Sequence, residues 1–135
     1  MTAQRIARYG TALVLVHLLV NMVHGAAHRA LHIGLDTEEK LFVAVVIIAG
    51  PLVAMALLWT TRQHAGLILL ALAMAGSLLF GVYHHFVAMG PDHVAAQPPG
   101  AWGITFVATS CLLALIEVYG AYAGVRWLFR PSATA

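Results

Sequence analysis

Four long apolar stretches, separated by three breaks, limit what this chain can fold into more than any other feature. They cover residues 6–33, 39–59, 65–89 and 102–129 of the 135-residue chain. Each is long enough to supply the ~20 apolar residues that a membrane-spanning helix needs. Because backbone groups in lipid must bond within their own segment, helices are the only spanning structure open to stretches of this length. The sequence therefore predicts a single four-span transmembrane domain over residues 1–135.

The breaks between the stretches carry residues typical of turns. The first reads Gly-Leu-Asp-Thr at 34–37, the second Thr-Thr-Arg-Gln at 60–63, and the third is a longer, proline-rich loop at 90–101. Short connections make sequential helices antiparallel neighbours. The predicted fold class is therefore all-α, an integral membrane four-helix bundle with up-down-up-down topology.

The basic residues predict the orientation of this bundle. Five of the seven fall on one side of the predicted membrane: Arg5, Arg8, Arg62, Arg126 and Arg130. The other side carries Arg29 and Lys40 together with four of the five acidic residues. Because loops on the cytoplasmic side are enriched in Lys and Arg, both termini are expected to be cytoplasmic. The expected location is the cell inner membrane, with the chain crossing it several times and the loop at 90–101 outside.

Composition excludes several classes of protein. Hydrophobic residues make up 61% of the chain and charged residues 9%, against about 45–50% and about 25% in soluble domains. So few charges exclude a nucleic-acid-binding face, and the single cysteine, Cys111, excludes an internal disulfide framework. The expected partners are the lipid bilayer and, through polar helix faces, a second copy of the chain or a larger membrane complex.

A stripe of polar residues marks the first apolar stretch. At 100° per residue, one face of that helix collects five of them: His17, Asn21, His24, His28 and His32. Ionisable side chains are costly in a bilayer and almost always face the interior of a bundle or a wet cavity. This face is therefore expected to point toward the other three helices.

The third and fourth stretches each present a face of small residues, which lets membrane helices approach closely. On the third stretch this face contains Ser77, Gly81 and His84. That register makes His84 the inward member of the pair His84–His85. On the fourth stretch the corresponding face contains Glu117, so its carboxyl group is also expected inside the bundle.

Depth along the helices divides the inward groups into two layers. The outer layer contains His24, His28, His32, His84, His85 and Glu39, with Asp92 and His93 in the loop above them. The deeper layer contains His17 and Glu117, which are predicted to lie at the same level and to pair. Such a pair serves either as a structural contact or as a proton relay.

The outer layer is suited to binding a metal ion. Histidines four residues apart on a helix, such as His24 and His28, point two imidazoles to one side, where they can share an ion. Neutral imidazole suits zinc, copper and iron. The predicted ligands are His24, His28 and His84, with a carboxylate from Glu39 and further candidates in His32 and His85.

Two other functions use the same features. Imidazoles on facing helices, here His24 or His28 against His84, also hold the iron of a b-type haem in helix bundles. Alternatively, the chain is a non-enzymatic subunit whose polar stripe and Gly120-x-x-x-Gly124 motif pack against partner helices. The sequence does not decide among a metal-handling or redox protein, a haem-bearing cytochrome or anchor, and such a subunit, nor whether the protein is an enzyme.

Two short segments add a resemblance to a known group of enzymes. His-Gly-Ala-Ala-His at 24–28 and Tyr-His-His-Phe at 83–86 are similar to the HxxxH and HH boxes of membrane di-iron desaturases and hydroxylases. Those enzymes have longer chains, further histidine boxes and a cytosolic site. The present chain lacks a third box, and its histidines are predicted on the outer side. The resemblance therefore covers these two segments alone.

Overall fold

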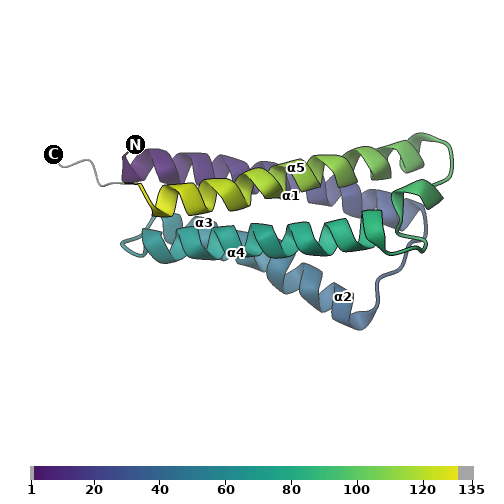
Figure 1. Cartoon of the computed structure of the whole chain (residues 1–135), viewed down its shortest axis with the longest axis horizontal. Helices are drawn as coiled ribbons and strands as arrows, with labels where there is room; N and C mark the ends of the chain where they lie inside the picture. Colours follow the sequence, from purple (N-terminus) through teal and green to yellow (C-terminus); the bar gives the residue numbers. More distant parts are fainter. Residues whose placement is uncertain (1, 131–135) are drawn as a thin grey trace.

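The computed structural model describes residues 2–130, and all of its long elements in that range are helices (Figure 1). The first span is α1 (Ala3–Ala30). The second is built from α2 (Thr37–Phe42), the π-helix η1 (Val43–Ala49) and α3 (Gly50–Leu58). The third is built from α4 (Gln63–Val82) and the π-helix η2 (Tyr83–Val87), and the fourth is α5 (Ala101–Leu128), preceded by the short 3-10 helix η3 (Val94–Ala96).

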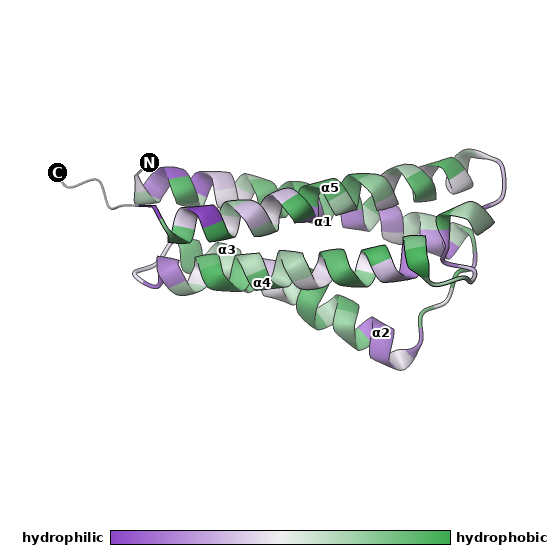
Figure 2. Cartoon of the chain, viewed as in Figure 1, coloured by the Kyte–Doolittle hydropathy of each residue, from purple (hydrophilic) through white to green (hydrophobic). Residues whose placement is uncertain are grey.

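These four spans confirm the four predicted from the sequence. All are long and apolar enough to cross a membrane, and each end lies within three residues of its predicted position. Large apolar side chains cover the outside of the bundle; Leu19, Leu79 and Leu115 are 62%, 71% and 69% exposed. Figure 2 shows that the spans are mainly hydrophobic, with hydrophilic residues concentrated toward the ends of the molecule. In water such a surface would be an aggregation hazard, whereas lipid solvates it.

The helices pack as a four-sided bundle. Both α1 and α4 contact α3 and α5, and the core between them contains Val14, Leu70 and Met74, which are fully buried. The glycines of the GxxxG motif lie inside this bundle. A Cβ atom at Gly124 would lie 2.9 Å from the Cβ of Ala71 on α4. This motif therefore closes the α4–α5 interface of the chain itself, instead of facing a partner.

The turn between the first two spans is fixed by local hydrogen bonds. The Asp36 carboxylate accepts the Glu39 N–H at 2.8 Å, and the Glu39 carboxylate accepts the Asp36 N–H at 2.7 Å. This capping box starts the second span. Just before it, His32 has a φ of 56°, a left-handed conformation in which histidine is enriched. His32 therefore serves the turn that ends the first helix, and its side chain is exposed.

The second span bends, and a cavity lies between its first half and the other helices. Pro51 has no N–H to donate, and the N–H of the preceding Gly50 bonds to the Val45 carbonyl, five residues back. A proline and a π-turn are both established causes of helix kinks. Figure 1 shows the α2 end of this span diverging from α4. Polar residues of α1, α4 and α5, among them Asn21, Ser77 and Glu117, line this cavity.

Candidate metal centre

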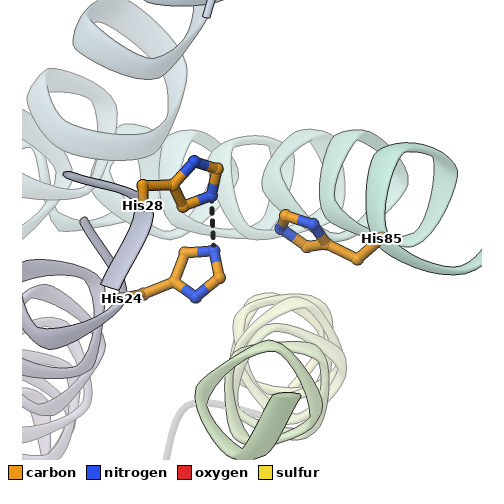
Figure 3. A group of neighbouring side chains, drawn as sticks. All are labelled: His24, His28 and His85. Carbon is orange, nitrogen blue, oxygen red and sulfur yellow. Dashed lines mark hydrogen bonds between the residues drawn. The ribbon is translucent and has the colours of Figure 1, made fainter. Parts of the chain in front are cut away.

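Three imidazole rings converge between α1 and η2. His24 and His28 lie one turn apart on α1, and His85 approaches from η2, so that one nitrogen of each lies within 4.8 Å of the others (Figure 3). The Nε2 atoms of His24 and His28 are 3.1 Å apart. The Phe106 ring of α5 packs against all three imidazoles, with centroid distances of 4.9, 5.0 and 5.2 Å. The cluster is thus held in a mostly buried, partly aromatic environment.

The member of the cluster contributed by the third span is His85, whereas the 100° spacing predicts His84. His85 is 8% exposed, and His84 is half-buried outside the cluster. The difference arises because residues 83–87 form a π-helix, whose turn contains more residues than an α-turn. Each residue therefore advances by less than 100°, and the face that carries Ser77 and Gly81 leads on to His85.

Two other predicted ligands lie together, apart from the cluster. The Nδ1 atom of His84 lies 3.5 Å from a carboxylate oxygen of Glu39, and the His84 ring packs on Phe80 with a centroid distance of 4.3 Å. Glu39 also caps α2, as described above. This pair links α2 of the second span to η2 of the third. His32, in the turn after α1, joins neither group.

Hydrogen bonds to the remaining ring nitrogens fix the tautomers of two cluster histidines. The Thr109 hydroxyl donates to the Thr105 carbonyl at 2.7 Å, so its oxygen accepts from His24 Nδ1 at 2.9 Å. The Asp92 carbonyl can only accept, so His85 Nδ1 donates to it at 3.1 Å. Both rings therefore carry their proton on Nδ1 and present an unprotonated Nε2. Metal-binding histidines almost always have such an outer partner.

Asp92, in the loop above the third span, adds a carboxylate to the cluster. Its Oδ1 atom lies 3.2 Å from His28 Nε2 and 3.4 Å from His85 Nδ1. Burial raises the pKa of this carboxyl group, but its interactions with His85, His28 and His24 outweigh that effect and lower the pKa below its ordinary value. Asp92 is therefore an anion at neutral pH. The sequence places Asp92 above the outer layer, but its contact with two histidines depends on how the loop folds back.

The distance between His24 Nε2 and His28 Nε2 has a direct chemical meaning. Two nitrogen lone pairs do not lie 3.1 Å apart unless a proton or a cation stands between them. Two imidazoles that share a tetrahedral zinc ion at about 2.0–2.1 Å have their nitrogens about 3.3 Å apart. The spacing therefore suits either an N–H···N hydrogen bond or a shared metal ion.

The deeper layer is present as predicted. His17 Nε2 lies 3.1 Å from Glu117 Oε1, and these residues are only 0% and 4% exposed. The Asn21 side chain donates to the His17 carbonyl at 3.0 Å and lies 3.1 Å from His17 Nε2. The pair joins α1 to α5 at the level where depth along the helices places both residues.

A cavity of about 480 Å³ lies beside the cluster and extends toward this deeper pair. Its walls come from all four spans and are mainly apolar, with Val43, Ile47, Phe80 and Leu113 among them. The polar residues that line it include His24, His28, His85, Asp92, Ser77 and Glu117. The candidate metal centre therefore borders a chamber large enough for a small molecule.

The chain matches no protein-family model, no curated protein and no solved structure.

Proposed function

We propose that this protein is a small multi-pass inner-membrane protein that binds a transition-metal ion through His24, His28 and His85. The observation that carries the proposal is the convergence of the three imidazoles, two of which have their protons held on the outer nitrogen by Thr109 and Asp92. A histidine that only fills space in a core needs no such arrangement. Here two unprotonated nitrogens are directed toward one point, which is what a metal ion requires.

The donor set indicates the class of metal. Three imidazoles provide three nitrogen ligands, which zinc, copper and iron accept, and the Asp92 carboxylate, 3.2 Å from His28 Nε2, is the nearest candidate for a fourth ligand. Because the cluster borders the cavity, a metal bound there can also exchange ligands with a small molecule. On this basis we propose a metal-handling or redox role. The distribution of basic residues supports an outer-side location of the cluster, with both termini in the cytoplasm.

A single ion suits the cluster better than a haem. A bis-histidine haem needs the space between two facing imidazoles for a wide, flat ring. Between α1 and η2 that space holds other rings: His24 and His85 are in edge contact with centroids 4.9 Å apart, and Phe106 packs against both. His84, the predicted haem ligand on the third span, lies against Glu39.

The test is elemental analysis of the untagged protein, purified in detergent without added metal and again after incubation with Zn²⁺, Cu²⁺ or Fe²⁺ followed by gel filtration. The wild-type chain is expected to hold one ion per chain. His85→Ala is expected to lose it. His84→Ala is the matched control, because it removes the neighbouring imidazole, which lies outside the cluster, and it is expected to keep the ion.

Two results would overturn the proposal. One is a wild-type chain that retains no metal under any of these conditions, which would leave an N–H···N hydrogen bond between His24 and His28 as the role of the cluster. The other is equal metal retention by the His85→Ala variant and the wild type. An absorption band of haem in the purified protein would favour the cytochrome alternative.

A further inference from the structure

The cavity beside the cluster contains polar groups that the metal centre does not use. Ser77, on α4, is 1% exposed, and its hydroxyl has no hydrogen-bond partner among the described residues. Glu117 uses Oε1 for His17, while its Oε2 lies 3.9 Å from the position of a Cβ atom at Gly81. Ser77, Gly81 and Glu117 all line the cavity. Because a buried hydroxyl without a partner destabilises the fold, the space beside Ser77 is suited to a group that can bond to it.

The cavity opens between α1 and α2. Four residues of its lining are exposed: Gly25 and Arg29 on α1, Gly34 in the turn after it, and Lys40 on α2. A Cβ atom at Gly25 would meet no atom within 4 Å, so no other side chain fills the opening at this point. Gly25 lies five residues before the end of α1 at Ala30, which is about 7.5 Å along a helix axis. The opening therefore reaches into the depth of the membrane, where lipid-soluble molecules have access to it.

From these observations we infer that the cavity binds a lipid-soluble molecule that carries a hydroxyl group. The hydroxyl accepts a hydrogen bond from Ser77 and donates one to Oε2 of Glu117, while the apolar part lies along Val43, Ile47 and Leu113. A neutral polar group fits the inner end, because the two basic residues of the lining, Arg29 and Lys40, are both at the opening. The inference does not require a bound metal ion.

The experiment uses the full chain in lipid nanodiscs and a photoreactive probe. The probe is a long-chain alcohol with a diazirine in its chain, and the matched probe is the same molecule with hydrogen in place of the hydroxyl. After irradiation, peptide mass spectrometry measures labelling of the cavity walls. The alcohol is expected to label peptides of α4 and α5 that line the cavity, and an excess of the same alcohol without diazirine is expected to suppress this labelling. The hydrocarbon probe is expected to label them much less.

Two variants test the inference: one closes the opening of the cavity, and the other removes the hydrogen bond from Ser77. Gly25→Phe places a ring in the opening and is expected to abolish specific labelling, whereas Gly25→Ala, for which there is room, is expected to retain it. Ser77→Ala removes one hydrogen bond and is expected to weaken probe binding about fivefold. Ser77→Ala only deletes an oxygen atom, so it keeps the test decisive if Gly25→Phe does not fold.

Equal labelling by the two probes, or labelling that neither Gly25→Phe nor Ser77→Ala changes, would contradict the inference. The metal content of the same samples keeps the two proposals apart. Absence of specific labelling in a wild-type chain that holds one ion overturns the cavity ligand alone. Specific labelling of a chain that retains no metal overturns the metal centre alone.

Discussion

The Nδ1 atom of His24 lies 2.9 Å from the hydroxyl oxygen of Thr109, and this hydroxyl is itself directed to the Thr105 carbonyl, 2.7 Å away. The two hydrogen bonds form a chain with a defined direction, from the imidazole through the hydroxyl to the backbone of α5. The backbone carbonyl cannot donate, so the direction cannot reverse. The backbone of one helix thus sets which nitrogen of a histidine on another helix is free to bind a metal.

This relationship predicts the effect of replacing Thr109 by Val, which has nearly the same shape but no hydroxyl. His24 then loses the acceptor for its Nδ1 proton, and both its tautomer and its ring orientation become less fixed. Metal affinity is expected to fall about 10–100-fold, as for other outer partners of ligand histidines. Titration with Zn²⁺ against a competing chelator measures it.

Thr105→Val is the matched control for that variant. The Thr105 backbone carbonyl remains in place, and its side chain takes part in none of the hydrogen bonds among the described residues. Its metal affinity should equal that of the wild type. If both variants lowered the affinity to the same extent, the effect would be one of helix packing and not of the hydroxyl.

The buried pair of His17 and Glu117 predicts strong coupling between two substitutions. Replacing Glu117 by Leu leaves the His17 imidazole without its carboxylate at a fully buried position, which is expected to cost about 1–3 kcal/mol of unfolding free energy. Replacing both residues by Leu removes the unpartnered group as well and should recover much of this loss. Thermal or denaturant unfolding in detergent provides the double-mutant cycle.

Additive effects in that cycle would show that the two side chains do not interact in the folded protein. The cycle also bears on the relay alternative. If His17→Leu with Glu117→Leu restores stability and leaves metal binding intact, the pair is required for neither, and its remaining role is proton transfer or ligand binding in the cavity.

The close approach of α5 to α4 predicts that Gly124 does not tolerate a methyl group. An added Cβ would lie 2.9 Å from the Cβ of Ala71 and 3.1 Å from its backbone nitrogen, so the two helices must separate. Gly124→Ala is expected to destabilise the protein by about 1–3 kcal/mol. Gly25→Ala is the control, since nothing lies within 4 Å of its added atom. Its unfolding temperature should be equal to or above that of the wild type, because alanine favours the helix.

The charge distribution predicts which loops a membrane-impermeant maleimide reaches in intact cells. In a Cys111→Ser background, a cysteine replacing the exposed Ala96 should be labelled from outside. A cysteine replacing the exposed Thr61, next to Arg62, should be labelled only after the membrane is opened. The opposite pattern would place the histidine cluster on the cytoplasmic side.

Much of the fold and part of the site follow from the sequence. Length and hydropathy define the four spans, because a chain segment that crosses lipid has few structures open to it besides the helix. Helical periodicity and depth bring His17 and Glu117 together, because both lie in regular α-helix, where 100° per residue applies. The same reasoning pairs His24 with His28 on one face of α1.

The remainder of the site could not be derived from periodicity. His84 and His85 exchange roles because the helix changes its winding at Tyr83, and no residue in that segment marks the change. Asp92 reaches His28 and His85 only because the loop after η2 folds back over the cluster. Glu39 contacts His84 and also caps the N-terminus of α2. Counting residues along an ideal helix predicts neither contact.

The π-turn at the end of the third span also bears on how such a site can be gained or lost. An i→i+5 turn contains one residue more than an i→i+4 turn, so deleting a single residue between Gly81 and His85 would return the segment to regular winding while leaving a helix long enough to span the membrane. With 100° per residue, the deletion would bring His85 to the position that regular winding directs into the bundle, so the π-turn keeps inside a histidine that one additional residue would otherwise rotate away. In related chains, a gap of one position in this segment would therefore leave the site intact, whereas loss of this histidine would remove it.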